Sequence, residues 1–368
     1  MKLCLYSPYI PEHLGGGEKY LLDVALTAQE LGYQPVVAVS SKQPLSQSKK
    51  DHIRNKYQQF LGKSLAQIEF QASPLGTRAN FFKKLVWTKQ FERLFYLTDG
   101  SLFYSLAGKN ILHIQVPLLI DKSGWKQRLK KRNWDQVCTN SAFTKSVVQP
   151  NWPIKVDQVL EPMIEVGHLG QGVDLGKKDK LILHVGRFFK QLHSKRQDVL
   201  VDNFRRLRKK YPKETKDWRL VLIGNIEDPD YAKEVATSVK SLPVEIIHQV
   251  SREELDQWYQ RASIYWHATG YRINDQVEPA KVEHFGISTV EAMAAGCAPV
   301  VIGKGGQLEV VGQELEKYTW LTKRDCVKNT IKLIRNQGLL EQVQKQAQAQ
   351  AKEFGPASFK EKLKKMLD

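Results

Sequence analysis

The chain has 368 residues, more than one ordinary hydrophobic core holds, so we expect two domains of about 150–200 residues each. Hydrophobic residues make up 42% of the chain and aromatic residues 10%, which excludes a wholly disordered protein. The formal net charge of +17 favours anionic partners: nucleic acid, an anionic lipid surface or a phosphorylated substrate.

The pattern at the start of the chain predicts a strand, a glycine-rich loop, a helix and a second strand. Residues 2–7 are rich in β formers, and residues 18–31, which follow three consecutive glycines, have apolar side chains at helical spacing. Residues 35–39 form a short apolar run. This β-α-β pattern puts the glycine loop at the carboxyl end of a strand, where open α/β sheets bind ligands.

The rest of the first half is less regular. Prolines at 150, 153 and 162 resist regular structure and indicate an interdomain crossing over 150–162. The other expected elements are a polar helix or loop at 41–60, a basic amphipathic helix at 81–96, and strands at 102–105, 111–116 and 137–140, the last followed by a helix that Ser141 caps.

A second alternation of strands and helices begins at Lys180. Short apolar runs predict strands, amphipathic runs predict helices, and the alternation predicts two doubly wound α/β domains. The expected strands are 181–185, 220–223, 244–248, 264–267 and 298–302, and the expected helices are 197–210, 231–239, 252–261, 288–295 and most of the tail from residue 325.

The segment from Glu283 to Glu291 carries the strongest functional signal. Ser288 stands where it can cap a helix, and Glu291, three residues later, completes the pattern of a capping box. A helix that begins beside Gly286 has free N–H groups and a positive dipole end that suit a diphosphate, and glycine lets a ligand approach the backbone. Because helix capping alone explains Ser288 and Glu291, the functional weight falls on Glu283 and Gly286.

The longer run EHFGISTVEAMAAGCAPVVIGKGGQLEVV resembles the donor-site signature of the retaining GT4 glycosyltransferases, which have the GT-B fold. Glu283 and Glu291 are the ends of its E-x7-E motif, and the E-H-F-G-I form is particularly similar to members that use GDP-mannose. The resemblance implies two Rossmann-like doubly wound α/β domains that face a central cleft. It implies an acceptor-binding domain at 1–162, a nucleotide-sugar-binding domain at 163–350, and a helix at 351–368 that crosses back to the first domain.

The resemblance also implies roles for single residues. Glu283 would hold hydroxyls of the transferred sugar, and Glu291 would hold those of the ribose. Arg187 and Lys195 would neutralise the leaving diphosphate, and His113 would shape the face of the cleft where the acceptor attacks. The implied donor-binding residues are Gly16, Gly17, Arg187, Lys195, Glu283, Phe285, Gly286, Ile287, Ser288 and Glu291, and the implied catalytic residues are Glu283, His113, Arg187 and Lys195.

Alternatives stay open for several of these residues. Lys190 competes with Lys195 as the second cation of the diphosphate site, and Arg187 can equally be an ordinary surface arginine. On sequence grounds alone, His113 is more often a hydrogen-bonded histidine within a strand. The three glycines lack the G-x-G-x-x-G spacing and can form a merely flexible turn.

The implied activity moves a hexose, with mannose favoured, from a nucleotide-diphosphate sugar to a glycan or lipid-linked acceptor with retention of the anomeric configuration. No cofactor or metal is expected, because no D-x-D triad lies in a convincing loop and Arg187 and Lys195 supply positive charge. The alternatives are a sugar-nucleotide epimerase, a catalytically silent donor-binding subunit, or an inverting GT-B transferase with His13 or His113 as general base. A nucleic-acid-binding protein is the alternative of another class, but the sequence has no zinc-finger spacing, RNP motif or helix-turn-helix signal.

Two stretches, 81–96 and 125–134, place basic residues beside aromatic ones. Such a pattern suits docking at an anionic membrane surface, and a solvated basic face over a core helix explains it equally well. The four cysteines have no paired spacing, no signal peptide opens the chain, and no apolar run approaches the about 20 residues of a membrane span. We expect a cytoplasmic protein with reduced thiols, and peripheral attachment to the inner face of the membrane is one of the two interpretations of its basic stretches.

Overall fold

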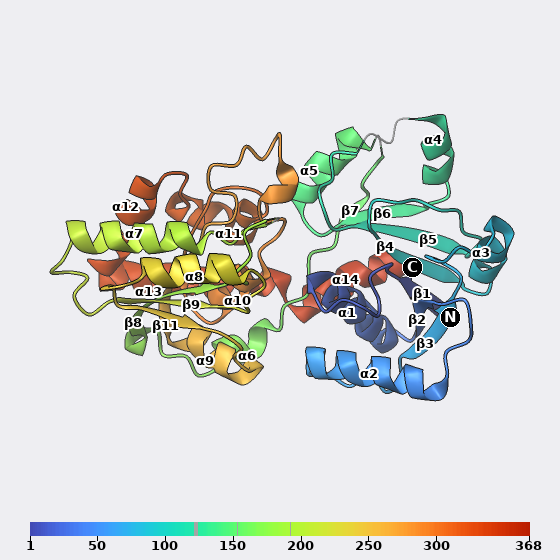
Figure 1. Cartoon of the computed structure of the whole chain (residues 1–368), viewed down its shortest axis with the longest axis horizontal. Coiled ribbons are helices and arrows are strands. Elements are labelled where there is room, and N and C mark those ends of the chain that lie inside the picture. Colours follow the sequence, from blue (N-terminus) through green and yellow to red (C-terminus); the bar gives the residue numbers. More distant parts are fainter. Residues whose placement is uncertain (121–123, 153, 192) are drawn as a thin grey trace. The chain divides into compact units, whose positions relative to one another are not determined.

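The computed structural model describes residues 1–120, 124–152, 154–191 and 193–368. The chain divides into two compact units, Met1–Met163 with Ala357–Asp368, and Ile164–Pro356. Each unit is a parallel β-sheet covered by helices (Figure 1), which confirms the expected α/β class. All four cysteines are buried free thiols, and within the described residues no helix combines the length and apolarity that crossing a bilayer demands.

The first unit is built on a seven-stranded parallel sheet with the order β3-β2-β1-β4-β5-β6-β7. Along β1, Leu3 and Leu5 lie in one core cluster and Cys4 and Tyr6 in another, so both faces of the sheet are covered. The strands are β1 (Lys2–Tyr6), β2 (Gln34–Ser40), β3 (Glu69–Ser73), β4 (Arg93–Thr98), β5 (Lys109–Ile114), β6 (Gln136–Thr139) and β7 (Gln158–Val159). The helices are α1 (Gly16–Glu30), α2 (Gln47–Leu61), α3 (Phe81–Thr88), α4 (Trp125–Lys131), α5 (Ala142–Asn151) and α14 (Pro356–Leu367).

The last helix of the chain, α14, packs on the first unit. Its Phe359 and Leu363 lie in the same core cluster as α1, and the ring of Phe359 meets that of Tyr20 edge-on at 6.1 Å. Arg93 Nε donates a hydrogen bond of 2.9 Å to the carbonyl oxygen of Leu367. Apolar packing and a hydrogen bond from the Arg93 side chain to a main-chain carbonyl therefore hold the end of the chain beside α1 (Figure 1).

The second unit has a five-stranded parallel sheet with the order β10-β9-β8-β11-β12. In α7, Leu200, Phe204 and Leu207 are buried whereas Arg205 and Lys209 are exposed, so the helical periodicity of the sequence seats this helix on the sheet. The strands are β8 (Asp179–Val185), β9 (Arg219–Ile223), β10 (Val244–Ile247), β11 (Ala262–His267) and β12 (Ala298–Val301). The helices are α6 (Val166–Gly170), α7 (Gln197–Lys210), α8 (Pro229–Ser238), α9 (Arg252–Arg261), α10 (Ile287–Ala294), α11 (Gln307–Leu315), α12 (Lys323–Ile334) and α13 (Gln337–Ala351), with 3-10 turns at Leu175–Lys177, Pro279–Lys281, Glu316–Tyr318 and Lys352–Phe354.

Three expectations for the first unit are wrong. The helix expected at 81–96 ends at Thr88, and residues 93–96 lie in β4, because pairing with β1 and β5 overrides the local periodicity. Residues 102–105 form no strand. Pro150 lies inside α5, one residue before the helix ends, where its missing N–H removes a single hydrogen bond.

Candidate functional site

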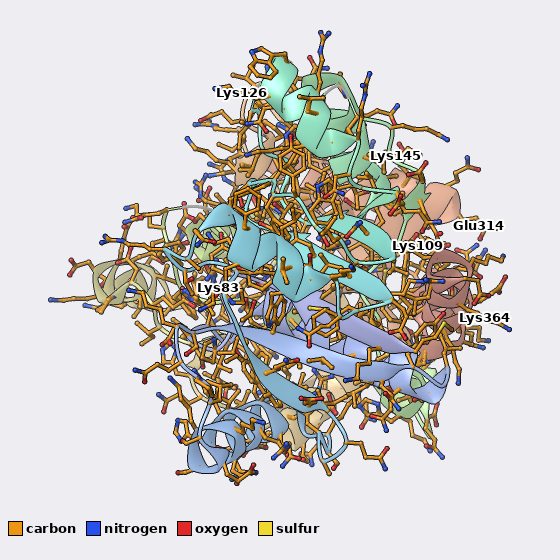
Figure 2. All side chains as sticks on the ribbon, turned by 90° about the vertical axis from the view of Figure 1, so that its right-hand side faces the viewer. Lys83, Lys109, Lys126, Lys145, Glu314 and Lys364 are labelled. Carbon is orange, nitrogen blue, oxygen red and sulfur yellow. The ribbon has the colours of Figure 1, made fainter. Side chains whose placement is uncertain are left out.

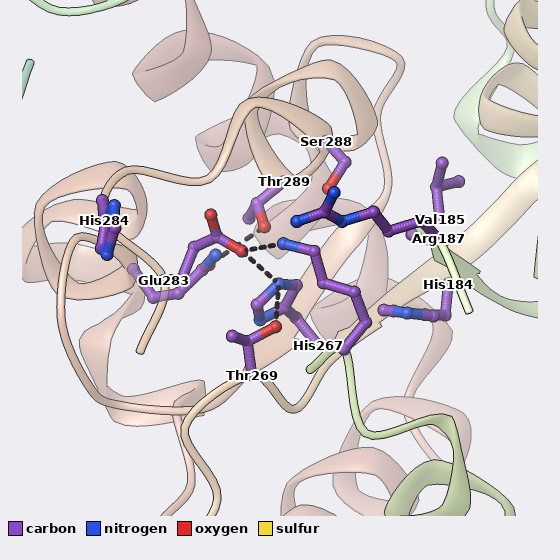
Figure 3. Close-up of polar contacts among 12 residues, drawn as sticks. His184, Val185, Arg187, His267, Thr269, Glu283, His284, Ser288 and Thr289 are labelled. Atoms are coloured by element: carbon purple, nitrogen blue, oxygen red, sulfur yellow. Dashed lines mark hydrogen bonds and ion pairs between the residues drawn. The ribbon is translucent and has the colours of Figure 1, made fainter. Parts of the chain in front are cut away.

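Glu283 lies at the centre of a cluster of polar side chains in the second unit. Its Oε2 atom is 2.5 Å from Lys195 Nζ and 3.0 Å from His267 Nε2 (Figure 3). Lys195 comes from the loop after β8, and His267 ends β11, the neighbouring strand in the sheet. Because parallel strands end at the same edge, these residues meet where α/β sheets bind ligands.

The charge state of this cluster follows from its contacts. Burial by itself would raise the pKa of Glu283, but the Lys195 ammonium and the His267 hydrogen bond hold that pKa well below its usual range. Burial lowers the pKa of His267, so its imidazole is neutral and donates its Nε2–H to the carboxylate. Thr269 Oγ1 is 3.2 Å from the same nitrogen. Glu283 is therefore an ionised carboxylate in a fixed orientation.

Helix α10 begins four residues after Glu283. Its N-cap residue, Gly286, has a φ of 123°, a conformation that favours glycine. A Cβ at this position would lie 2.5 Å from Gln307 Nε2, so space requires glycine as well. The first N–H groups of an α-helix have no partner within the helix, and with the helix dipole they suit an anion.

The capping box expected at Ser288 and Glu291 is wrong. The positive φ of Gly286 turns the chain into the helix two residues before Ser288, whose Oγ instead lies 2.8 Å from Tyr265 Oη. The carboxylate of Glu291 accepts hydrogen bonds from Arg252 Nη1 at 2.6 Å and from Tyr259 Oη at 3.0 Å. Tertiary partners, not a helix cap, hold Glu291.

The residues on either side of Gly286 differ in exposure. The Phe285 side chain is 3% exposed and meets the ring of Phe354 edge-on at 5.2 Å. Ile287 is the first residue of α10 and is half-buried. The side chain of Phe285 therefore serves packing, and a ligand would meet the backbone of this turn.

The three candidate cations have different surroundings. Lys195 is 17% exposed and touches Glu283, and its stem packs so closely on Gly186 that a Cβ there would lie 2.7 Å from Lys195 Cγ. Arg187 pairs with Glu227 at 3.0 Å, and Lys190 pairs with Glu234 at 2.8 Å; their side chains are 41% and 61% exposed. Of the two lysines, the geometry places only Lys195 in contact with Glu283.

The first unit holds the other predicted site residues. Gly16 and Gly17 open α1 at the carboxyl end of β1, and a Cβ on Gly17 would lie 3.2 Å from Gln115 Oε1. His113 is fully buried between the rings of Tyr20 and Phe95, at centroid distances of 4.3 and 5.7 Å. Burial lowers the pKa of His113 to about 3. The glycines thus form a helix start, whereas His113 lies in the core.

Sequence analysis missed His267, Thr269 and Arg252. His267 had a usable signal, because it is a polar residue at the end of an apolar strand, where ligand-binding side chains gather in α/β sheets. Arg252 stands 39 residues before Glu291 and has no local signal. Among the described residues, no group of three or more histidines, cysteines or carboxylates is arranged to hold a metal ion.

Most of the second unit, which contains this site, is similar to a known protein family. Residues 171–350 match the family model of glycosyl transferases group 1. A GDP-Man:Man(3)GlcNAc(2)-PP-Dol alpha-1,2-mannosyltransferase of Neurospora crassa is 26% identical over 250 residues, which are 64% of this chain and 39% of that protein. This chain therefore corresponds to well under half of its fungal relative.

Solved structures match the whole chain. A glycosyltransferase from Rickettsia africae has a TM-score of 0.72 at 16% identity, and the match covers 100% of this chain and 96% of that one. HepE from Anabaena, solved with UDP-glucose, has a TM-score of 0.68 at 15% identity, with coverage of 100% and 98%. These structural similarities confirm the GT-B fold, and the match of residues 171–350 supports a glycosyltransferase of group 1.

Proposed function

We propose that this protein is a retaining glycosyltransferase that moves a hexose, with mannose favoured, from a nucleotide-diphosphate sugar to a glycan or lipid-linked acceptor. The observation that carries the proposal is Glu283, an ionised carboxylate held by Lys195 and His267 close to the start of α10. A carboxylate suits sugar hydroxyls, and a lysine beside a helix N-terminus suits a diphosphate. The preference for GDP-mannose rests on the E-H-F-G-I run and on the donor named for the fungal relative.

Each residue of the cluster has a role in this proposal. Glu283 accepts hydrogen bonds from hydroxyls of the transferred sugar. Lys195, together with Arg187, neutralises the charge that builds on the leaving diphosphate. Glu291 binds the ribose hydroxyls, which then share its carboxylate with Arg252. His113 receives no catalytic role, because its side chain is fully buried in the core of the first unit.

Retention of configuration is also part of the proposal. Retaining glycosidases use two carboxyl groups about 5–5.5 Å apart, one of which attacks the sugar. Glu283 is instead engaged by Lys195 and His267, which suits binding better than attack. We therefore infer a front-face attack in which a phosphate oxygen of the donor takes the proton of the acceptor. Proton NMR of the product anomer separates this route from inversion by a general base such as His13.

The donor is tested by thermal unfolding with GDP-, UDP-, ADP- and dTDP-sugars. We expect GDP-mannose to raise the Tm most, because it is the proposed donor. A ligand at 100 times its Kd adds about 2.7 kcal/mol to the stability of the folded state. Free mannose and inorganic diphosphate serve as controls for the two halves of the donor. A largest shift with another nucleotide would correct the donor, and no shift with any nucleotide sugar would contradict the enzyme proposal.

We further propose that α3 and α4 dock on an anionic membrane surface. Phe81, Phe82 and Val86 of α3 are 51%, 74% and 65% exposed, and Trp125 of α4 is 68% exposed. Figure 2 views the first unit from the side on which α3 and α4 lie, and it labels Lys83 on α3 and Lys126 on α4. Apolar side chains beside lysines are typical of helices that lie in a membrane interface. The strand part of 81–96 is buried and takes no part.

Co-sedimentation with vesicles tests this docking. The wild-type protein should bind vesicles that contain phosphatidylserine and leave those of phosphatidylcholine alone, because each lysine near an anionic surface adds about 1 kcal/mol. Phe82→Ser combined with Val86→Ser should reduce the bound fraction several-fold. Phe60→Ser, on α2 and 38% exposed, is the matched control. Failure of the wild-type protein to bind either kind of vesicle contradicts the proposal.

A further inference from the structure

A cavity of about 620 Å³ lies in the first unit, and none of the residues assigned above to the donor site lines it. Its walls are the loops that follow β2 and β3, the end of β3, the first turn of α2 and one side of α3. Strands β3, β2 and β1 are neighbours in the parallel sheet, so this cavity opens at the sheet edge that also carries Gly16 and Gly17. Its volume is within the range of about 300–1,000 Å³ that small-molecule sites span.

The cavity is lined by four cationic side chains and, among the described residues, by no carboxylate. The cations are Lys42, Lys50, Arg78 and Lys83. In the part of the chain that the structure describes, none of the four has an ion pair within 4 Å, whereas nearby Arg54 pairs with Asp51 at 2.7 Å. Four like charges around one cavity repel one another, and a bound anion with two or more charges would offset that repulsion.

The rest of the wall is polar and aromatic. Gln43, Gln71 and Asn80 present amide groups, which both donate and accept hydrogen bonds. Trp87 is half-buried and offers a flat apolar surface. Amides and an indole ring suit the hydroxyls and the apolar face of a sugar, as the cations suit a phosphate.

We propose that this cavity binds a phosphorylated saccharide and holds the phosphate-bearing part of the acceptor. The substrate class rests on the proposed transferase activity, whereas the site itself rests on the four cations and the polar wall. The same chemistry is presented by a soluble sugar phosphate and by a phosphorylated lipid headgroup.

Calorimetry on the full chain tests the site with glucose 6-phosphate and with glucose as its neutral match. Glucose 6-phosphate should bind at least tenfold more tightly than glucose, and Lys50→Gln combined with Lys83→Gln should weaken it at least tenfold. Lys216→Gln combined with Lys240→Gln removes the same charge from exposed positions of the second unit and should leave the affinity within about twofold, because neither side chain lines the cavity. Both double variants replace side chains that are not fully buried, and their Tm values check the fold.

Competition separates the two sources of the phosphate. Vesicles with phosphatidylinositol 4-phosphate either displace glucose 6-phosphate, which identifies a lipid headgroup, or leave it bound, which identifies a soluble sugar phosphate. Either result supports the site when the cavity variant alone loses binding.

The site is overturned if wild-type protein binds neither glucose 6-phosphate nor these vesicles. An equal loss of affinity for glucose 6-phosphate in the two double variants overturns it as well, because such a loss would be an effect of net charge. The rise in Tm caused by nucleotide sugars, measured in the same preparations, distinguishes failure of the cavity proposal from failure of the transferase proposal. If a nucleotide sugar raises the Tm but glucose 6-phosphate does not bind, only the proposed cavity site is refuted. If glucose 6-phosphate binds but no nucleotide sugar raises the Tm, the proposed transferase activity is refuted.

Discussion

Replacing Glu283 by glutamine should lower kcat by about 10²–10³-fold, the usual loss when one preorganised electrostatic group is removed, with a much smaller change in nucleotide affinity. Glutamine keeps the shape and still accepts a hydrogen bond from His267, but it loses the charge that Lys195 holds in place. If Glu283 fixes the sugar during transfer, its main effect falls on kcat. Steady-state kinetics with the donor that stabilises the protein, and calorimetry with the nucleoside diphosphate, measure the two effects separately.

Two carboxylates serve as controls for this variant. Glu291→Gln should act mainly on donor affinity, because Glu291 is proposed to bind the ribose. Glu278 lies in the same loop as Glu283, is 42% exposed and pairs with Lys281, so Glu278→Gln should change neither kcat nor affinity. Equal losses of kcat and affinity in both the Glu283 and Glu291 variants would contradict the roles assigned to them.

Replacing Lys195 by methionine should both weaken donor binding at least tenfold and destabilise the protein. Breaking a buried ion pair costs about 3–5 kcal/mol, and because both side chains of this pair are 17% exposed, we expect about 2–3 kcal/mol. Lys190→Met removes the same charge from the surface, where its partner Glu234 is 56% exposed, and should leave Tm and donor affinity nearly unchanged. Stronger loss of donor affinity in the Lys190 variant would make Lys190 the diphosphate lysine.

The destabilisation by Lys195→Met should depend on pH in a defined direction. The folded-state pKa of Glu283 is held well below 4.5, so its ionisation stabilises the folded state above that pH. This stability is lost as the pH falls through the lowered pKa. Without Lys195, one of the two groups that lower the pKa of Glu283 is gone, so this pKa rises relative to the wild type. The stability difference between wild type and variant should therefore be full at neutral pH and shrink as the pH falls, first through the pKa of Glu283 in the variant and then through its lowered pKa in the wild type, which denaturant unfolding at several pH values can measure. A difference that does not change with pH would show that the lysine acts through packing alone.

His267 explains why Glu283 is more than a surface carboxylate. Its neutral imidazole donates to Oε2 of Glu283, the same oxygen that Lys195 contacts. With one oxygen held on the protein side, the proposed contact with the sugar falls to the other oxygen. His267 is thus a positioning residue in the proposed site, and it was visible in the sequence only as the polar end of an apolar strand.

Much of the fold could be predicted from local patterns. Apolar runs and amphipathic periodicity identified α7 and α9 with their observed limits, and the strands of the second unit to within one or two residues. Local patterns failed where pairing decided the outcome. Residues 93–96 have the periodicity of an amphipathic helix, yet they lie in the central strand β4, because two neighbouring strands bury them.

The sequence by itself determined the α/β class, the glycine at position 286 and the run from Glu283 to Glu291 that resembles a donor-site signature. The tertiary structure decided which side chains meet. Lys195 and Glu283 are 88 residues apart in the chain and touch because β8 and β11 are neighbours in a parallel sheet, an order that no local pattern encodes. The tertiary structure also placed His113 in the core and brought Arg252 and Tyr259 within hydrogen-bond distance of Glu291. Burial and long-range hydrogen bonds depend on the packing of the whole unit.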